Sequence, residues 1–322
     1  MFALTSLSII ILSSCQAPAP SASPYANTAY YGASGYQQPV YQQPVVQTYQ
    51  QPTYAAPVQA QPAFQYAGVD AQAQHTASSA PIIRAESYLL IDANSGRPLV
   101  ARNADTVRGV ASTQKLLTAL VVLDAGNLDK KVKIQSTDTA VEPTKLGVRA
   151  GEIYTRRELL YAFLVKSAND LAKVLARDNA GGQAAFAAKM NAKARSLGMR
   201  SSYFVNPHGL TAPGQHSTAR DMARVAMAAY RNDVIRDAVR RKYFTFRFNS
   251  GRKITLENTN DLLGAMPECN GMKTGYTNAA GRCLISSASS GGRAVILIQL
   301  GTKTKYIWDD ARVLMSWGLR NL

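Results

Sequence analysis

The sequence predicts a mixed α+β (α/β) fold over residues 81–322, with one antiparallel sheet flanked by helices on both faces. Three observations predict it: two short strands open this region, helices fill its middle, and strands followed by one last helix close it. We expect the N-terminal strand pair to join the C-terminal strands. With 46% hydrophobic and 17% charged side chains, a chain of 322 residues can bury a sizeable core.

The first elements are a strand pair and a buried helix. Residues 87–91 (SYLLI) read as a strand, residues 94–96 (NSG) as a turn and residues 98–101 as the return strand. A nearly all-apolar helix is expected from Ser112 to about residue 125, where a glycine stops it. A helix that is apolar on every side is a central, buried one.

Residues typical of helix ends indicate three further helices. Residues 155–158 (TRRE) form a capping box that opens one of them. Residues 183–197 are an alanine-rich helix closed by Gly198, and residues 218–221 (TARD) cap a helix that runs to about Tyr230.

The last part of the region is rich in strands. Residues 243–248 and 253–256 flank Asn249-Ser250-Gly251 and predict a hairpin. Three more strands are expected, and then a closing helix. Their ranges are 272–277, 282–287 and 294–301 for the strands and 308–319 for the helix.

The N-terminus has the pattern of an export signal. Residues 4–12 are apolar, and Ser13, Ser14 and Cys15 follow them, which resembles a bacterial lipobox. The resemblance implies that residues 1–14 are a signal peptide and that a lipid on Cys15 anchors the chain to a membrane. Residues 1–8 lack the usual Lys or Arg, so either the true start lies upstream or the signal is unusual.

Residues 15–80 predict a disordered tether between the membrane and the folded region. Gln, Pro, Tyr, Ala and Ser dominate the segment, and Tyr-Gln-Gln-Pro recurs at 36–39, 41–44 and 49–52. Such a composition has too few aliphatic residues to form a core. The folded catalytic region is therefore expected to begin at residue 81.

Composition limits the partners and cofactors. The net charge is +16, and the first 83 residues hold no Lys, Arg or Glu, so the folded region is strongly basic. A basic surface attracts a polyanion, either nucleic acid or an anionic cell envelope. With three His and no zinc-type cysteine pair, we expect no metal site and no cofactor.

Three short motifs carry the candidate chemistry. Ser112 and Lys115 lie three residues apart at the start of the buried helix, which puts a nucleophile beside a possible base. Ser167 and Asn169 form an S-x-N between two helical stretches, and residues 273–275 form a K-T-G on a strand. S-x-x-K alone occurs by chance in most chains of this size, but the ordered set of three does not.

These motifs resemble the low-molecular-mass penicillin-binding proteins of the D-alanyl-D-alanine carboxypeptidase family. The flanking residues match as well, over about residues 85–320: 90–96 (LIDANSG), 206–210 (NPHGL), 217–222 (STARDM) and 273–277 (KTGYT). The resemblance implies the transpeptidase fold shared by penicillin-binding proteins and β-lactamases. It also implies peptidoglycan stem peptides as substrates, β-lactams as covalent inhibitors, a position in the periplasm or on the envelope face, and no nucleic-acid partner.

The resemblance also assigns roles to the motif residues. Ser112 would attack the carbonyl between the two terminal D-alanines, and a neutral Lys115 would take its proton. Burial and a second cation, Lys273, would lower the pKa of Lys115. Ser167 would relay the proton to the leaving D-alanine, and Asn169 would hold the substrate backbone or orient Lys115.

Further expectations concern substrate binding. Lys273 and Thr274 would face the substrate carboxylate, and Gly275 would leave room for substrate to pair along the strand. The backbone N–H groups of Ser112 and Tyr276 would form the oxyanion hole.

His208 is an auxiliary candidate. It lies on a loop that either influences deacylation or is a structural turn, and the sequence does not separate the two. No Glu occurs between Asp170 and Asp221, so we expect slow release of a penicilloyl adduct instead of efficient β-lactam hydrolysis.

The chain departs from the family pattern in two places. Asn270 stands where relatives often carry an acid, and where they carry an arginine after the last strand only Lys303 and Lys305 are found.

Cys269 and Cys283 are expected to be buried thiols instead of a disulfide.

Two other functions remain open at this stage. A DD-endopeptidase that cuts cross-bridges carries the same three motifs, and a non-catalytic wall-binding lipoprotein could reuse the fold. The sequence also leaves open the third stem-peptide residue, the choice between inner and outer membrane, and the oligomeric state.

Overall fold

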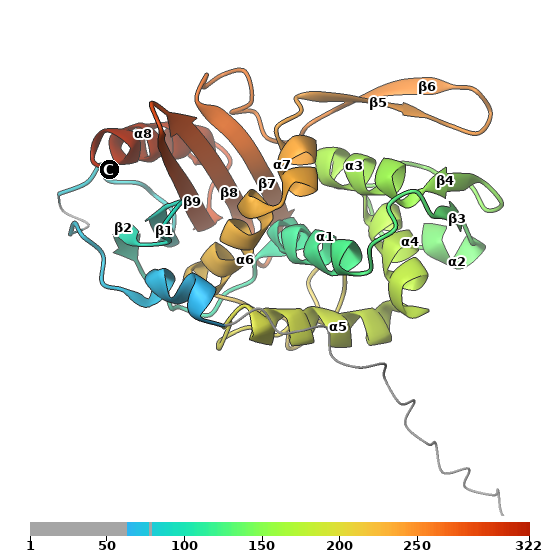
Figure 1. The fold of residues 1–322 in the computed structure, drawn as a ribbon, viewed down its shortest axis with the longest axis horizontal. Helices are drawn as coiled ribbons and strands as arrows, with labels where there is room; N and C mark the ends of the chain where they lie inside the picture. Colours follow the sequence, from blue (N-terminus) through green and yellow to red (C-terminus); the bar gives the residue numbers. More distant parts are fainter. Residues whose placement is uncertain (1–62, 77–78) are drawn as a thin grey trace, which may run out of the picture. The chain divides into compact units, whose positions relative to one another are not determined.

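The computed structural model describes residues 63–76 and 79–322. The centre of this part is a five-stranded antiparallel sheet in the order β2-β1-β9-β8-β7 (Figure 1). Because β1 pairs with β9, the predicted return of the N-terminal hairpin to the C-terminal strands is confirmed. The strands are β1 (Ser87–Asp92), β2 (Pro98–Arg102), β7 (Cys269–Thr277), β8 (Gly281–Ser290) and β9 (Arg293–Thr302).

Helices cover both faces of this sheet, which confirms the predicted fold class. The last helix, α8 (Ile307–Arg320), packs on one face, and its Leu314 and Met315 are fully buried. Beyond the other face lie the larger hydrophobic core and the remaining main helices, of which the last two contact the sheet and the others pack beside them (Figure 1). These are α1 (Lys115–Asp124), α3 (Arg156–Lys166), α4 (Asn169–Ala180), α5 (Gln183–Ser196), α6 (Ala219–Arg231) and α7 (Asp233–Val239).

The predicted helix caps are present. The Thr155 hydroxyl accepts from the Glu158 N–H, and the Glu158 carboxylate accepts from the Thr155 N–H at 2.8 Å, so the capping box opens α3. The Thr218 hydroxyl accepts from the Asp221 N–H at 3.0 Å and opens α6. Gly198 follows the end of α5 with a φ of +81°, which suits a glycine.

The helix expected from Ser112 starts differently. Residues 111–114 form a 3₁₀ turn, η2 (Ala111–Gln114), and the α-helix α1 begins at Lys115. The tight turn forms because the N–H and the hydroxyl of Thr113 both donate to the carbonyl of Val110. The helix is buried as predicted, since eight of its ten residues are buried.

The hairpin β5 (Tyr243–Arg247) and β6 (Lys253–Glu257) is confirmed and forms its own two-stranded sheet, packed against α3. Several short elements were not predicted from the sequence. They are η1 (Ala63–Asp70), β3 (Lys131–Lys133), α2 (Ser136–Thr139), β4 (Ile153–Thr155) and the helix α7.

The structure differs from the expected end of the tether at residue 80, because the chain packs on the domain from Tyr66 onward. Tyr66 and Val69 of η1 are buried, and the Asp70 carboxylate pairs with the guanidinium of Arg224 on α6. The N–H groups of residues 74 and 75 then donate to carbonyls of β2. The buried side chains of Tyr66 and Val69, the ion pair and two backbone hydrogen bonds hold the segment to the domain, although its composition is polar. The signal peptide, Cys15 and the rest of the tether lie outside the described residues.

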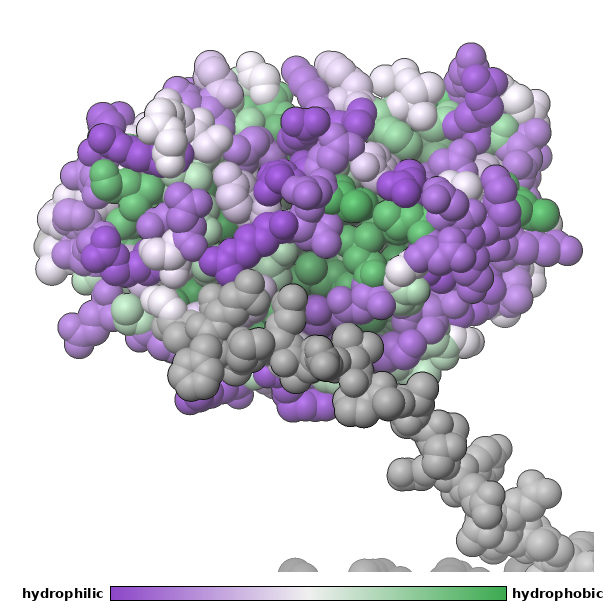
Figure 2. Space-filling model, viewed as in Figure 1, coloured by the Kyte–Doolittle hydropathy of each residue, from purple (hydrophilic) through white to green (hydrophobic). Residues whose placement is uncertain are grey.

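Within residues 63–76 and 79–322, no helix has both the length and the apolar composition needed to cross a bilayer. Figure 2 shows one face covered mainly by hydrophilic residues, with apolar ones gathered near its middle. Cys269 and Cys283 are buried free thiols, as expected.

Replacing Val69 with Ala tests the docking of η1. The side chain is 0% exposed, so losing two buried methyl groups is expected to lower the free energy of unfolding by about 2 kcal/mol. Urea unfolding measures it. Val313→Ala on α8 is the control, because that side chain is 49% exposed and its loss should change stability by less than about 0.5 kcal/mol. Equal stability of the two variants would contradict the docking.

Candidate active site

Two close backbone approaches bring the motif segments together. A Cβ at Gly275 would lie 2.8 Å from the Ser112 nitrogen, so β7 can run this close to η2 only because residue 275 is glycine. A Cβ at Gly209 would lie 2.2 Å from the Ala111 oxygen, and Gly209 has a φ of +88°. Two glycines therefore fit the K-T-G strand and the 206–210 loop around the first turn of the S-x-x-K motif.

Lys115 is the centre of the site. Its side chain is fully buried, and its Nζ lies 2.7 Å from Ser112 Oγ, 2.8 Å from Asn169 Oδ1 and 2.6 Å from the His208 carbonyl oxygen. Burial holds the pKa of Lys115 well below that of a free lysine, and the charge of Lys273 lowers it further. The carboxylate of Asp170 acts in the opposite direction. The result is an amine with low proton affinity beside a hydroxyl.

Asn169 is held so that its oxygen faces Lys115. Its Nδ2 donates to the carbonyl oxygens of Glu142 and Pro143, at 3.2 and 2.7 Å, which fixes which end of the amide faces the lysine. Ser167 ends α3 with a φ of +62°, and Ala111 precedes Ser112 with a φ of +47°. Left-handed backbone at residues other than Gly or Asn is uncommon and often marks functional sites.

Lys273 is a buried residue of β7. It is 1% exposed, and burial lowers its pKa to about 7. Its Nζ donates to the Thr274 carbonyl oxygen at 3.2 Å. The hydroxyl of Thr274 lies 2.6 Å from that of Thr259.

One cleft collects most of the predicted site residues. It has a volume of about 440 Å³, and Ser112, Ser167, Asn169 and residues 274–276 line it. Lys115 and Lys273 are buried behind this lining. The cleft therefore offers a hydroxyl backed by a buried amine, next to an edge strand that is open to an extended peptide.

Comparison with known proteins shows which family the chain belongs to. The D-alanyl-D-alanine carboxypeptidase family matches residues 74–304. The chain belongs to this family of serine peptidases.

Individual relatives agree with the family assignment. A D-alanyl-D-alanine carboxypeptidase of Mycobacterium tuberculosis is 37% identical over 257 residues, which are 77% of this chain and 87% of the relative. A D-alanyl-D-alanine endopeptidase of Escherichia coli is 35% identical over 260 residues, 79% of this chain and 83% of the relative. The crystal structure of a Streptomyces DD-transpeptidase superposes with a TM-score of 0.71 at 31% identity and covers 75% of this chain and 99% of that one.

His208 supplies a backbone group in this member of the family. Its carbonyl oxygen accepts from Lys115 Nζ and, at 3.2 Å, from Ser112 Oγ. Its Nδ1 accepts from the Leu210 N–H at 3.2 Å, and burial followed by the charges of Lys115 and Lys173 lowers its pKa to about 3. The contacts of the neutral ring fit the structural-turn interpretation.

The cleft also contains residues that the sequence analysis missed. Arg282, Thr304 and Trp308 line it together with Tyr276, and Thr259 and Asp261 line it as well. Arg282 follows the K-T-G by only a few residues, so the register of a tight β7–β8 hairpin could have found it. Of the two lysines considered instead, Lys303 lines a different hollow and Lys305 lies with its Nζ 4.7 Å from the Tyr306 ring centroid.

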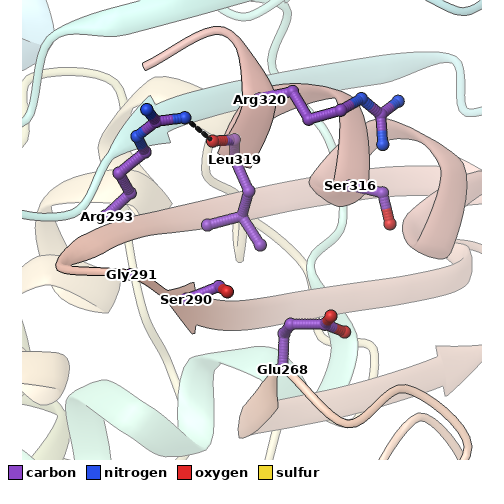
Figure 3. A pocket seen from close by; sticks show the side chains of 7 residues that line it. All are labelled: Glu268, Ser290, Gly291, Arg293, Ser316, Leu319 and Arg320. Carbon is purple, nitrogen blue, oxygen red and sulfur yellow. Dashed lines mark hydrogen bonds between the residues drawn. The ribbon is translucent and has the colours of Figure 1, made fainter.

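Another hollow, of about 360 Å³, lies at the other end of β7 (Figure 3). Glu268, Arg293 and Arg320 line it, and Arg293 donates to the Leu319 carbonyl oxygen. None of the motif residues reaches this hollow, so it adds nothing to the Ser112 site. Across the described ranges, no group of three or more His, Cys, Asp or Glu is arranged to hold a metal ion.

Gly275→Ala tests the approach of β7 to the η2 turn. The added Cβ would meet the Ser112 and Thr113 nitrogens at 2.8 and 3.0 Å, so stability should fall by about 1–3 kcal/mol in urea unfolding. Gly182→Ala is the matched control, since Gly182 has extended backbone and nothing within 4 Å of its Cβ position. If both variants are as stable as the wild type, the close approach is wrong.

Proposed function

We propose that this chain is an exported serine D-Ala-D-Ala carboxypeptidase that removes the terminal D-alanine from peptidoglycan stem pentapeptides. The observation that carries the proposal is the 2.7 Å contact between Lys115 Nζ and Ser112 Oγ in a fully buried setting on the wall of a peptide-sized cleft. The family match and the relatives of known activity support it.

Acylation begins with Ser112. Its hydroxyl attacks the carbonyl carbon of the penultimate D-alanine while neutral Lys115 accepts the proton. The N–H groups of Ser112 and Tyr276 stabilise the oxyanion, and the close approach of β7 to η2 at Gly275 supports this pairing. When the C–N bond breaks, Ser167 passes the proton to the amine of the departing D-alanine. An ester on Ser112 remains.

Deacylation completes the cycle. Water attacks the ester carbonyl, Lys115 takes its proton, and Ser112 regains a proton as the tetrapeptide leaves. Asn169 keeps the Lys115 amine directed at Ser112, and Lys273 and Thr274 face the substrate carboxylate. No Glu lies between Asp170 and Asp221, and Asp261 is the one carboxylic acid among the residues that line the cleft. We therefore also propose that a β-lactam leaves a slowly released adduct on Ser112.

The proposed setting is the cell envelope. A lipid on Cys15 holds the chain to a membrane. The positive charge of the folded region suits an anionic envelope. Peptidoglycan stem peptides are then the substrate, and nucleic acid is not a partner.

A DD-endopeptidase is the second candidate. Two observations favour it: relatives in Escherichia coli and Pseudomonas aeruginosa are D-alanyl-D-alanine endopeptidases, and the cleft continues past Thr274 to Thr304 and Trp308. A cross-bridge has a larger leaving group than D-alanine and would occupy that extension. The contacts of Lys115 with Ser112 and Asn169 disfavour the non-catalytic wall-binding lipoprotein.

Muropeptide digestion separates these functions. The full-length wild type should convert pentapeptide to tetrapeptide with loss of one alanine, read by liquid chromatography with mass detection. Ser112→Ala should lose this activity by at least about 10³-fold, because the nucleophile is gone. Ser250→Ala in the β5–β6 turn should retain it. Cleavage of cross-linked dimers alone would indicate the endopeptidase, and wall binding without any product would indicate the non-catalytic lipoprotein.

The pH dependence of acylation tests the role of Lys115. Its lowered pKa predicts a rate with fluorescent penicillin that rises with pH and levels off well below 10.5. Lys273→Met removes a neighbouring positive charge, which favours protonated Lys115, so the rise should move to higher pH by roughly one unit.

Lys253→Met on exposed β6 is the control and should leave the profile in place. A Lys273→Met profile that moves to lower pH, or does not move, would contradict the assignment of Lys115 as the base.

A further inference from the structure

Asp170 is a buried carboxylate to which the proposed reaction gives no role. It is the second residue of α4, directly after Asn169 of the S-x-N motif, and it is 1% exposed. In the part of the chain that the structure describes, it has no ion-pair partner, whereas the other buried aspartates each pair with an arginine: Asp138, Asp221 and Asp310. Burying a carboxylate without a cation is costly, so hydrogen bonds have to stabilise it.

Backbone N–H groups supply these hydrogen bonds to Asp170. The Leu146 N–H donates to both carboxylate oxygens, at 3.0 Å each, and the Gly147 N–H donates to Oδ2 at 2.9 Å. The Leu171 N–H donates to Oδ1 at 2.9 Å. Two of these three donors come from 23 and 24 residues earlier in the chain, so Asp170 ties that segment to the first turn of α4.

The segment held by Asp170 also contacts Asn169 and the cleft. The carbonyl oxygens of Glu142 and Pro143 accept from Asn169 Nδ2, at 3.2 and 2.7 Å, and the Thr144 carbonyl oxygen accepts from the Asn169 N–H at 2.7 Å. Pro143 and Thr144 line the cleft. The first turn of α4 therefore binds residues 142–147 through their carbonyls and through their N–H groups.

The place of this segment fixes which way the Asn169 amide points. Nδ2 keeps its two carbonyl acceptors only while residues 142–147 stay in position, and Oδ1 then lies 2.8 Å from Lys115 Nζ. A displaced segment would let the amide rotate and would remove one of the oxygen atoms that hold the amine beside Ser112 Oγ. A change at Asp170 can therefore reach the reacting atoms through Asn169.

The charge of Asp170 acts on the same amine. Burial and then the charge of Lys273 lower the pKa of Lys115, and the charge of Asp170 raises it. Of the other elements around this amine, α3 contributes the uncharged ring of Phe163, whose centroid is 6.0 Å from Nζ. The loop of His208 contributes an imidazole that is neutral in the working range, because its pKa is lowered to about 3. Asp170 is therefore the anionic group that opposes Lys273.

We propose that Asp170 is a positioning residue for acyl transfer, because it holds residues 142–147 against α4 and thereby fixes the amide of Asn169. Through that amide it keeps the amine of Lys115 directed at the hydroxyl of Ser112. The inference rests on the proposed function, in which Lys115 activates Ser112, and adds a residue that touches neither the substrate nor the reacting atoms.

Asp170→Asn tests the proposal on the full-length protein. The variant keeps the size of the side chain but removes its charge and sets an amide NH₂ group against a backbone N–H donor. In the pH profile of acylation by fluorescent penicillin, the plateau should fall by about tenfold to hundredfold, because small misplacements of catalytic groups have effects of that size. The rise should move to lower pH by about one unit, because loss of a neighbouring negative charge disfavours protonated Lys115.

Asp310→Asn is the matched control. Asp310 is also a buried aspartate in the first turn of a helix, α8, and it also accepts a backbone N–H from a distant segment, that of Arg84 at 2.7 Å. Its charge is not among those that act on Lys115. The variant should lower the midpoint of urea unfolding, keep the rise at the wild-type pH and keep the plateau within about threefold of the wild type.

Lys173→Met tests the same segment from the surface. The Nζ of Lys173 donates to the Ala140 carbonyl oxygen at 2.7 Å, just before the residues that Asp170 and Asn169 hold. Because this side chain is only partly buried, its loss should leave the fold intact. The plateau should fall by about twofold to fivefold, because one hydrogen bond to the segment is lost.

The outcomes are distinct. An unchanged plateau in Asp170→Asn, a rise that stays in place or moves to higher pH, or the same two changes in Asp310→Asn would overturn the inference and leave the proposed function standing. If Asp170→Asn does not fold, an unchanged plateau in Lys173→Met overturns the inference. If penicillin does not acylate the wild type, the proposed function fails, and the inference that rests on it falls with it.

Discussion

The site depends on keeping the amine of Lys115 buried, largely unprotonated and in contact with the Ser112 hydroxyl. Burying an amine without partners is costly, and here three oxygen atoms surround Nζ within hydrogen-bond distance. Two of them come from other segments, the His208 loop and the start of α4. The tight turn at η2, the glycine at 209 and the left-handed Ala111 follow from the need to bring these segments to one point.

The two edge strands of the central sheet differ in whether another part of the chain pairs with them, and this difference supports the peptide-binding proposal. At β2, the N–H groups of Gln74 and His75 pair with strand carbonyls, so the chain covers its own edge. At the other edge, β7 carries the K-T-G motif beside the cleft. An edge strand left unpaired next to a nucleophile suits a substrate that adds as an extended strand.

Local signals in the sequence predicted most of the fold. The capping box at Thr155, the cap at Thr218 and the Asn249-Ser250-Gly251 turn depend on neighbouring residues alone, and all three were correct. The docking of η1 and the cleft position of Arg282 depend on tertiary contacts and strand register, so the sequence analysis missed both. It considered Lys303 and Lys305 because they follow the last strand, but strand pairing places Arg282 nearer to the K-T-G. The three motifs were recognised, and their roles stay a proposal, as does the lipid on Cys15.

The most direct test of the central claim is the titration of Lys115 itself. In protein labelled with ¹³C at lysine Cε, the Lys115 resonance can be assigned by comparison with Lys115→Arg and followed from acid to alkaline pH. We expect it to titrate well below the 10.5 of a free lysine, so that the amine is available as a base. A Lys115 resonance that titrates at 10.5 or above would mean that the amine is protonated in the working range and would contradict the mechanism.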